Sequence, residues 1–374
     1  MLAGGPWGGG AVVVLALTKC LLEAGHQVTV LCLSDEVSRR FAAAGAKVVT
    51  FRHWRREINP LRDLLAYLEI YHFIKREQFD IVHTHTSKGG ILGRLAARSA
   101  GTAVVIHTVH GFAFTELTRP VEQIFYLQVE KMAAHFCDML ISVNNEDRLL
   151  AIEAGIVAAD KIVTILNGID LSQFYPIQEV AALRHERGFS RNGFLVGTVG
   201  RLASQKGYEY LLRAIPDVLR YHPETYFVFA GEGPLRAEFQ ALADHTGIAD
   251  HCRFLGFRQD IPQLLSCFDM FVMPSLKEGL SITLLEAMAT GKAIVATDIR
   301  GNREVITHCI NGIICRPMSS ESLAEGIIQL IGNPALAQEL GKQAHCDVIQ
   351  RYDQRFMLEQ TMNLYRQLLQ KNSN

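Results

Sequence analysis

Glu278 and Glu286 are two carboxylates eight positions apart, on either side of an expected loop-to-helix junction. The strand expected before them ends near Ser275, and the helix after them ends near Gly291. A strand, a glycine-containing loop and a helix N-terminus form a natural anion site, because unpaired N–H groups and the helix dipole both point at the ligand. Carboxylates beside such a site suit an anion that carries vicinal diols, because they accept hydrogen bonds from hydroxyl groups. A nucleotide sugar has a diphosphate between two such diols.

Two cations lie in a second loop of the same kind. Gly200 and Arg201 follow an apolar run that predicts a strand, and Lys206 comes directly before Gly207 and the next expected helix. Fixed cations at such a turn can neutralise a diphosphate, because arginine offers a planar fork and lysine a point charge. A single surface arginine or lysine is more often just solvated, but two of them around one glycine-containing turn favour an anion site.

Further candidates also follow expected strands. His110 ends a strand and precedes Gly111, where a substrate or another backbone segment can approach closely; the alternative is a histidine with a purely structural role. Gly231 belongs to a Gly-Glu-Gly-Pro segment that is either a simple turn or a close approach to a ligand. Phe257, just beyond another strand, could receive a flat base.

Glycines and histidines in the first half of the chain carry weaker signals. The glycine-rich segment 4–10, which includes Gly9 and Gly10, precedes a helix, but it lacks the G-x-G-x-x-G register and a preceding strand. His83 and His85 share one face of a strand, where a metal is conceivable. Because no acidic or cysteine residue has ligand-like spacing from them, no metal or other cofactor is expected.

The overall composition restricts the class of protein. The chain has 374 residues, 49% of them hydrophobic and 20% charged, which suits two soluble globular domains. A net charge of −1 argues against a nucleic-acid-binding protein. No apolar run reaches the roughly eighteen residues of a membrane span, and no basic segment precedes the first apolar run as in a signal peptide. The eight cysteines are scattered without a C-x-x-C pair, which indicates free thiols in a reducing cytosol.

Residues 47–62 form a basic segment, with five Lys and Arg against one Glu. Arg52, Arg55 and Arg56 surround Trp54. A run of charges is usually a solvated face. Basic residues around a tryptophan could also rest on an anionic membrane surface. A cytoplasmic protein is therefore expected, and peripheral attachment to the inner face of a membrane stays open.

Expected strands and helices alternate along the whole chain, which predicts βαβ units and parallel sheets. The expected strands cover residues 27–33, 47–51, 81–85, 104–110, 139–143, 161–166, 194–199, 226–230, 252–256, 270–274, 293–297 and 312–315. The expected helices cover residues 11–24, 61–77, 90–100, 120–136, 145–154, 207–221, 234–245, 282–290, 320–332, 334–350 and 354–370. The pattern breaks near Tyr175 and Pro176, so we expect domains at residues 1–176 and 177–353, followed by a terminal segment 354–374. Two doubly wound domains would enclose a cleft, with ligands at the carboxyl ends of the strands.

The chain resembles the retaining family-4 glycosyltransferases of GT-B architecture over nearly its whole length. The most specific part is the E-x7-E stretch from Glu278 to Glu286, followed by Ala-Met-Ala and then Thr290 and Gly291. Other matching segments are 109–112, 166–170, 200–202, 205–207, 231–234 and 254–257. Segments 83–88 and 107–110 resemble the branch that builds bacterial surface polysaccharides and lipid-linked oligosaccharides.

The resemblance implies a role for each candidate residue. Arg201 and Lys206 would hold the donor diphosphate and stabilise the leaving group without a metal. Glu286 would bind the ribose hydroxyls, Glu278 would contact the transferred sugar, and His110 would contact that sugar from the other domain. The remaining donor contacts would come from Gly9, Gly10, Gly200, Gly231, Phe257 and the backbone at Leu280, Ser281 and Ile282.

The N-terminus departs from the family pattern. Family members begin with a strand that leads into the glycine-rich loop, whereas this chain starts Met-Leu-Ala-Gly-Gly-Pro, so the first strand of the N-terminal domain is apparently missing or vestigial. The loss of a central strand would leave its neighbours unpaired on a buried edge. The expectation is therefore either a start further upstream or a compromised domain.

The sequence predicts a glycosyltransferase that moves a hexosyl or N-acetylhexosaminyl group, with retention, from a nucleoside-diphosphate sugar, expected to be a UDP-sugar. The expected acceptor is a hydroxyl group of a saccharide or polyprenyl-linked saccharide in surface polysaccharide synthesis. Two alternatives stay open. A nucleotide-sugar 2-epimerase needs acid–base groups around C2 and C3 of the sugar, and the two cations with the E-x7-E stretch argue against it. A non-catalytic GT-B-like partner protein is motivated by the missing strand.

Overall fold

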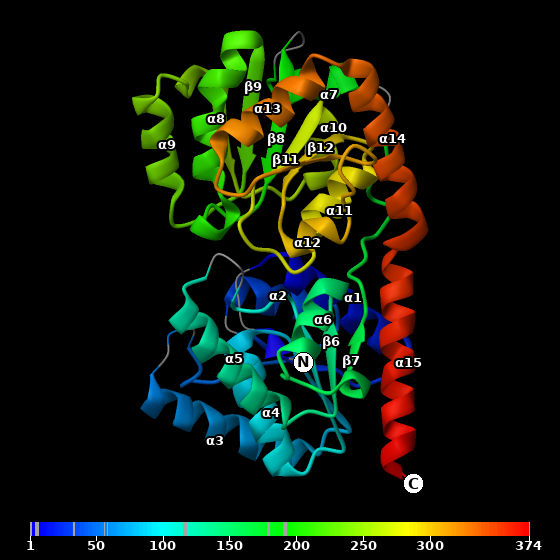
Figure 1. The fold of residues 1–374 in the computed structure, drawn as a ribbon. Coiled ribbons are helices and arrows are strands. Elements are labelled where there is room, and N and C mark those ends of the chain that lie inside the picture. Colours follow the sequence, from blue (N-terminus) through cyan, green and yellow to red (C-terminus); the bar gives the residue numbers. More distant parts are fainter. Residues whose placement is uncertain are drawn as a thin grey trace. The chain divides into compact units, whose positions relative to one another are not determined.

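The computed structural model describes residues 2–3, 7–32, 34–55, 57, 59–114, 118–177, 180–189 and 193–373. The chain divides into two compact units (Figure 1). The first contains Met1–Asn167 together with Gln354–Asn374, and the second contains Gly168–Asp353. The division therefore falls before the boundary expected at about 176. The terminal helix α15 (Gln354–Ser373), red in Figure 1, belongs to the first unit.

The first unit is built on a seven-stranded parallel sheet of order β3-β2-β1-β4-β5-β6-β7. Its strands are β1 (Leu2–Ala3), β2 (Thr29–Cys32), β3 (Lys47–Val49), β4 (Ile81–Thr84), β5 (Val104–Val109), β6 (Met139–Ser142) and β7 (Ile162–Thr164). Strand β5 is buried along its whole length, as expected where helices cover both faces of a parallel sheet.

Strand β1 corrects the expectation of a missing first strand. Leu2 pairs with Leu31 on one side and with Thr84 on the other, and Ala3 pairs with Cys32. Two extended residues are thus enough to connect β2 with β4 at the centre of the sheet. Of the two expectations, a missing strand is wrong, and a vestigial strand of two residues is what the structure contains.

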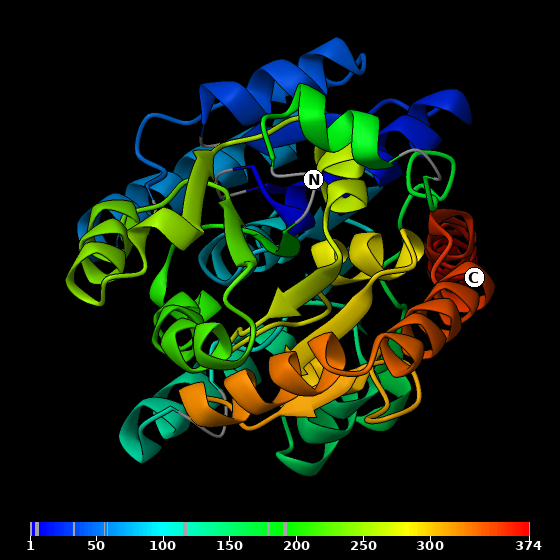
Figure 2. The same cartoon turned by 90° about the horizontal axis from the view of Figure 1, so that it is seen from above.

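Helices cover both faces of the first sheet (Figures 1 and 2). Helices α3 (Pro60–Glu77), α4 (Ser87–Ala100) and α5 (Pro120–Ala134) pack together on one face. Helix α1 (Gly9–Glu23) contacts α2 (Asp35–Ala43) and α15, and α6 (Asn145–Glu153) packs against β6 and β7. Helix α2 was not expected from the sequence, although its hydroxyl cap and two acidic residues in its first turn favour a helix start.

Trp54 lies in the core of the first unit, where it is only 2% exposed. A Cβ atom at Gly89 would stand 2.9 Å from its ring, so the indole packs against the first turn of α4. The contact of Trp54 with a membrane, which the sequence left open, is therefore excluded for its ring, because the ring is already covered by protein. Arg52 and Arg55 are exposed, and Arg56 lies outside the described residues.

The second unit contains a six-stranded parallel sheet of order β10-β9-β8-β11-β12-β13. Its strands are β8 (Phe194–Val199), β9 (Thr225–Ala230), β10 (Cys252–Gly256), β11 (Met270–Met273), β12 (Ala293–Thr297) and β13 (Ile313–Cys315). The two sheets confirm the predicted α/β class with parallel strands.

Two groups of helices pack in the second unit (Figure 2). Helix α8 (Tyr208–Tyr221) contacts α9 (Arg236–His245) and α13 (Ser320–Ile331), while α11 (Ile282–Ala289) contacts α10 (Ile261–Cys267) and α14 (Pro334–Arg351). The sequence did not predict α7 (Val180–Glu186), α10 or α12 (Arg300–Arg303), all of which are too short to show a helical repeat.

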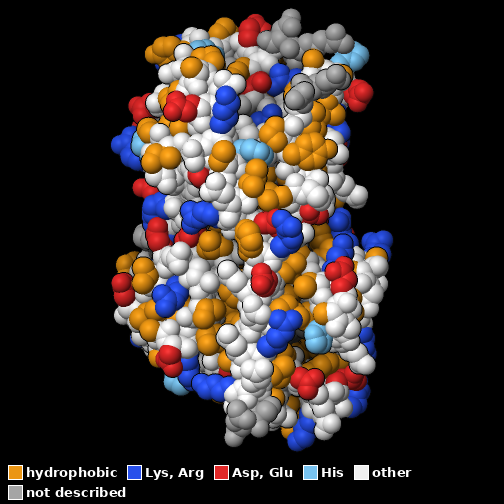
Figure 3. All heavy atoms as spheres, turned by 90° about the vertical axis from the view of Figure 1, so that its right-hand side faces the viewer, with side chains coloured by type: hydrophobic (Ala, Val, Ile, Leu, Met, Phe, Trp, Pro, Cys, Tyr) orange, Lys and Arg blue, Asp and Glu red, His pale blue; other side chains and the backbone are white. Residues whose placement is uncertain are grey.

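No helix in the described ranges combines the length and the apolarity that a membrane span needs. Acidic and basic side chains are mixed on the surface that Figure 3 shows. All eight cysteines are free thiols.

A Gly207→Ala variant tests the close packing between the turn before α8 and the end of β11. Gly207 has φ +62°, and a Cβ atom there would stand 2.1 Å from the Pro274 carbonyl oxygen. Gly247 is the matched control, with φ +69° and open space at its Cβ position. Both alanines carry the cost of a left-handed conformation, about 1 kcal/mol, but only the one at 207 must also displace backbone.

We expect Gly207→Ala to lower the midpoint of thermal unfolding by roughly 5 °C more than Gly247→Ala does, which corresponds to about 2 kcal/mol. Calorimetry of both variants measures the difference. Equal shifts would show that the contact with Pro274 does not constrain the turn.

Candidate active site

Three neighbouring strands of the second unit end at the candidate site. Strand β8 lies between β9 and β11 in the sheet, and all three run parallel. Their carboxyl ends therefore meet at the same edge, where α/β sheets bind ligands. The residues that follow them are Gly200 after β8, Gly231 after β9 and Ser275 after β11.

Glycines hold the loops after these strands in direct backbone contact. Gly231 has φ +145°, and a Cβ atom there would stand 1.9 Å from the carbonyl oxygen of Gly200. The turn at Gly207 packs against the end of β11, where the backbone N–H of Leu276 donates to the carbonyl of Gln205 at 2.8 Å. A side chain at either glycine would separate the loops, so the glycines determine how closely the candidate residues can meet.

Lys206 and Glu278 form an ion pair at this edge of the sheet. Lys206 Nζ lies 2.5 Å from Glu278 Oε1, and the two side chains are 13% and 12% exposed. The Ser275 hydroxyl donates to the same carboxylate oxygen at 2.7 Å. Burial opposes the charge of Lys206, but the Glu278 carboxylate outweighs it and raises the pKa of Lys206. Lys206 is therefore a fixed positive charge whose partner is held in place by a hydroxyl group.

The loop after β11 is supported from behind by α12. Gly301 in this helix lies so close to the loop that a Cβ atom would stand 2.5 Å from the carbonyl oxygen of Gly279. The Thr297 hydroxyl at the end of β12 donates to the carbonyl of Ser275. These contacts fix the loop that presents the carboxylate.

Helix α11 begins at the same loop. Ser281 is its N-cap residue, and the Ser281 hydroxyl accepts a hydrogen bond from the Leu284 N–H at 3.4 Å. The side chains of Leu280, Ser281 and Ile282 are buried. A ligand at this helix end would therefore meet the backbone of these residues rather than their side chains.

Glu286 lies on the second turn of α11. Glu286 is partly buried, and desolvation by the surrounding protein raises the pKa of Glu286 to about 7. A carboxyl group with this pKa is half protonated at neutral pH. Hydrogen bonds donated by a ligand diol would favour its charged form.

The structure brings Gly200, Lys206 and Glu278 together. A Cβ atom at Gly200 would stand 2.7 Å from the Tyr208 hydroxyl and 3.5 Å from Cε of Lys206. Two other predicted residues lie in the loops that follow β8 and β10. Arg201 is half-buried in the loop after β8, and no ion pair in the described part of the chain joins it to Glu278. Phe257 follows β10 and is 46% exposed.

His110 lies at the end of β5 in the first unit, beside the start of α1. A Cβ atom at Gly10 would stand 3.8 Å from the His110 ring, so the first turn of α1, which begins at Gly9, passes over the imidazole. His110 Nε2 lies 3.2 Å from Nδ1 of His85, and the two rings are stacked. Burial lowers the pKa of His110 to about 4, so the ring is neutral at physiological pH.

The neighbouring histidines belong to a buried polar network. His83 Nδ1 lies 2.5 Å from the Tyr365 hydroxyl, and His83 Nε2 lies 2.7 Å from the Thr108 hydroxyl. Both ring nitrogens of His83 are thus used within the protein, and burial lowers its pKa well below the usual value. No group of three His, Cys, Asp or Glu in the described ranges is arranged to hold a metal ion.

Sequence reasoning missed three residues that shape these sites: Ser275, Tyr208 and Tyr365. Ser275 lies three positions before Glu278, and Tyr208 lies two positions after Lys206. Their nearness in the sequence to predicted site residues could have identified both. Tyr365 comes from α15 and reaches His83 over a separation of 282 positions, which no local pattern could show.

Both halves of the chain match known families. The family described as Glycosyltransferase Family 4 matches residues 7–173, and the family described as Glycosyl transferases group 1 matches residues 180–346. The UDP-Gal:alpha-D-GlcNAc-diphosphoundecaprenol alpha-1,3-galactosyltransferase of Escherichia coli is 35% identical over 285 residues, which cover 75% of this chain and 74% of that enzyme. The chain belongs to the family-4 glycosyltransferases.

Further relatives agree with this family. The N,N'-diacetylbacillosaminyl-diphospho-undecaprenol alpha-1,3-N-acetylgalactosaminyltransferase of Campylobacter jejuni is 27% identical over 367 residues, which cover 94% of each chain. The solved structure of Anabaena HepE with UDP and glucose has a TM-score of 0.85 at 22% identity and covers 98% of both chains. The sucrose-phosphate synthase of Thermosynechococcus elongatus has a TM-score of 0.83 at 21% identity and covers 99% of this chain and 96% of that one. These likenesses show that this glycosyltransferase has the GT-B fold.

A Glu286→Gln variant tests the desolvated carboxyl group on α11. The pKa of Glu286 is about 7 in the folded protein against an ordinary value of 4.5, so the folded protein keeps a proton that the unfolded chain releases between these pH values. The free energy of unfolding should therefore fall as the pH rises from about 4.5 to 7, by an amount on the order of 1–3 kcal/mol, and stay lower above pH 7.

The Glu286→Gln variant has no carboxyl group that titrates at this position, so its free energy of unfolding should not fall in this way. We therefore expect the variant to gain stability relative to the wild-type protein as the pH rises from about 4.5 to 7. Denaturant unfolding at several pH values measures the difference. The exposed Glu339→Gln in α14 is the control. If the Glu286→Gln difference did not change with pH, the carboxyl group would not be desolvated as described.

Proposed function

We propose that this glycosyltransferase transfers a sugar from a UDP-sugar to a hydroxyl group of a lipid-linked saccharide, with retention of the anomeric configuration. The observation that carries the proposal is the Lys206–Glu278 ion pair at the carboxyl edge of the second sheet. An ammonium group there suits a diphosphate, and a carboxylate beside it suits sugar hydroxyls.

Related proteins support a UDP-sugar donor. The name of the Escherichia coli relative specifies UDP-Gal, and HepE, whose fold is similar, has been solved with UDP-glucose. In our proposal Lys206 and Arg201 hold the diphosphate. Glu286 binds the ribose diol, and Glu278 accepts hydrogen bonds from the transferred hexose or N-acetylhexosamine.

Related proteins also support the acceptor class. The names of the Escherichia coli and Campylobacter jejuni enzymes both specify a saccharide joined through a diphosphate to undecaprenol. We propose the same class here, a saccharide on a polyprenyl diphosphate that is used in surface polysaccharide synthesis. This acceptor would be presented at a membrane surface, where a peripheral enzyme can reach it.

The proposed reaction exchanges one bond at the sugar C1 for another on the same face of the ring. The bond from C1 to the UDP oxygen breaks, and the bond from C1 to the acceptor oxygen forms. A phosphate oxygen of the departing UDP takes the acceptor proton. The protein contributes placement and charge stabilisation, with Lys206 beside the developing negative charge and no metal required.

The epimerase alternative is not favoured. An epimerase needs titratable groups placed around C2 and C3 of a bound sugar. The relatives named above are transferases. Incubation with UDP-GlcNAc in the absence of an acceptor separates the two functions, because only an epimerase would form a new nucleotide sugar under those conditions.

Lys206→Met and Glu278→Gln test the proposed active site. Each removes one charge from the pair, so we expect the turnover number to fall at least about 100-fold, as when a group that stabilises transition-state charge is lost. Transfer of radiolabelled sugar from UDP-Gal or UDP-GalNAc to a synthetic polyprenyl-diphosphate GlcNAc measures the loss. Asp217→Asn is the control, because Asp217 pairs with Arg220 on the exposed surface of α8 in the same unit.

Circular dichroism shows whether the variants remain folded. Wild-type turnover in either active-site variant would refute the assignment. NMR of the product linkage tests retention separately, since an inverted anomeric centre would contradict the proposed geometry while leaving the transferase activity intact.

A further inference from the structure

Helices α3 and α5 of the first unit expose an unusual number of large hydrophobic side chains. Seventeen such residues are exposed in the described part of the chain, and nine of them lie on these two helices. Leu61 is 70% exposed and Val121 is 79% exposed. Folded proteins seldom gather exposed apolar residues in this way unless the surface binds something. We call seven of them the outer patch: Leu61, Leu64, Leu65 and Leu68 on α3, with Val121, Ile124 and Phe125 on α5.

The outer patch forms one stripe along each helix, on the side away from the core. On α3 the leucines follow the spacing i, i+3, i+4 and i+7, which places them on one face. The residues of α3 that pack into the core, such as Ala66, Ile70 and Phe73, lie on the opposite face. Both helices pack against α4 on the same face of the sheet (Figure 1), so both stripes point away from that sheet.

The segment that carries the α3 part of the outer patch is positively charged. Residues 47–77 contain seven Lys and Arg against four Asp and Glu, a net charge of +3 in a chain whose total is −1. The three acids of α3 are each held by a basic partner. These pairs are Asp63 with Lys88 at 2.5 Å, Glu69 with His53 at 2.8 Å and Glu77 with Lys47 at 2.7 Å.

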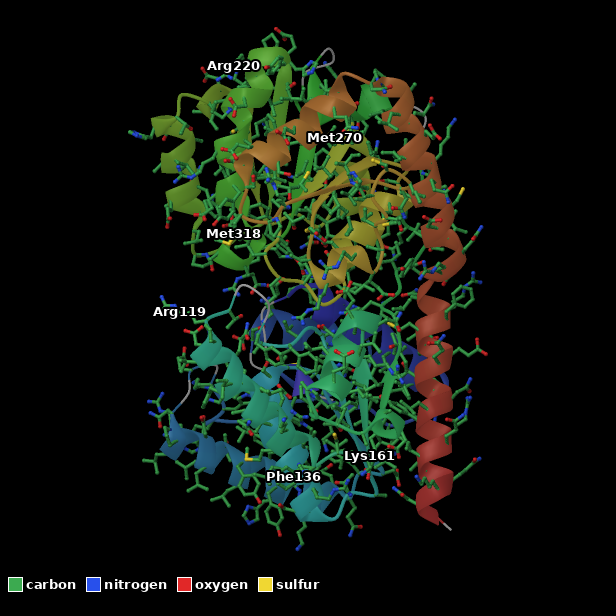
Figure 4. The ribbon with its side chains drawn as sticks, in the orientation of Figure 1. Arg119, Phe136, Lys161, Arg220, Met270 and Met318 are labelled. Atoms are coloured by element: carbon green, nitrogen blue, oxygen red, sulfur yellow. The ribbon has the colours of Figure 1, made fainter. Side chains whose placement is uncertain are left out.

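Basic side chains remain at the edges of the outer patch. Arg62 and Lys75 are exposed on α3. Arg119 extends outward from the start of α5 (Figure 4). An apolar stripe bordered by cations is complementary to a bilayer with anionic headgroups.

We propose that the outer patch docks this glycosyltransferase on the surface of an anionic lipid bilayer. The leucine and aromatic side chains would enter the boundary between headgroups and acyl chains, and Arg62, Lys75 and Arg119 would contact headgroup phosphates. The proposal rests on the proposed function, because a polyprenyl-linked acceptor is held in such a bilayer. It moves the membrane contact from Trp54, which is buried, to the exposed sides of α3 and α5.

Vesicle binding tests the apolar part of the proposal. One double variant carries Leu64→Gln and Leu68→Gln, and the other carries Ile124→Gln and Phe125→Gln. The matched control carries Leu149→Gln and Ile349→Gln, whose side chains are 50% and 45% exposed outside the outer patch. We expect wild-type protein and control to sediment with vesicles of phosphatidylcholine and phosphatidylglycerol. Each patch variant should bind at least about tenfold more weakly, since two large apolar side chains no longer enter the lipid.

A second pair of changes tests the charge. Arg62→Gln with Lys75→Gln should weaken binding to the same anionic vesicles roughly tenfold or more, at about 1 kcal/mol for each charge near the surface. It should have little effect on the weaker binding to pure phosphatidylcholine. Added salt should weaken the binding of the wild-type protein to anionic vesicles.

Three outcomes would overturn the proposal. Wild-type protein could stay in solution with both kinds of vesicle. The control could lose as much binding as the patch variants. Alternatively, gel filtration could show a wild-type dimer that the patch variants convert to a monomer, which would mean that a second copy of the chain covers the patch.

Activity on two acceptors separates this proposal from the proposed function. With a water-soluble short-chain acceptor, the patch variants should keep wild-type kcat/KM, whereas with the acceptor embedded in vesicles their kcat/KM should fall with the loss of binding. If wild-type protein binds vesicles through the patch but transfers sugar to neither acceptor, the proposed function fails and the docking surface stands. If transfer occurs equally in both formats for all variants, the docking surface fails.

Discussion

The chemistry of the second unit depends on how closely two of its loops approach each other. Lys206 and Glu278 are separated by 72 positions in the sequence, yet their charged atoms lie 2.5 Å apart. A largely buried ammonium group without a partner would be costly, so the Glu278 carboxylate keeps Lys206 charged before any ligand is present. A diphosphate could take over that role and leave Glu278 available to sugar hydroxyls. In the proposed function, the ion pair therefore keeps both groups in place before the donor binds.

Backbone packing, rather than side-chain packing, sets the distance between these loops. Gly207 fits against the Pro274 carbonyl, and Gly231 fits against the Gly200 carbonyl, with no space for a Cβ atom at either position. Contacts between backbone atoms of neighbouring strand ends are rigid, because each strand is fixed in the sheet by its own hydrogen bonds. The charged groups can thus be placed accurately although lysine and glutamate side chains are flexible.

The sequence predicted the α/β class and the helices and strands with clear repeats, and it indicated that Gly200, Lys206 and Glu278 follow parallel strands. Those inferences succeed because the strand ends of a parallel sheet share one edge. Contacts that depend on packing could not be predicted in this way. The basic residues around Trp54 gave no sign that its ring is buried, and the contact of Tyr365 with His83 joins residues that only the folded chain brings together. Helix α12, with four residues, is too short to show a repeat.

The two units present different kinds of chemistry at the carboxyl ends of their strands. The second unit supplies fixed charge through Lys206 and Glu278. The first unit supplies His110, which is neutral at physiological pH because burial lowers its pKa to about 4. A neutral imidazole can exchange hydrogen bonds with a sugar hydroxyl but does not attract a diphosphate as a cation would. The strand ends of the second unit therefore suit a ligand that carries negative charge, whereas His110 in the first unit suits an uncharged group that bears hydroxyls.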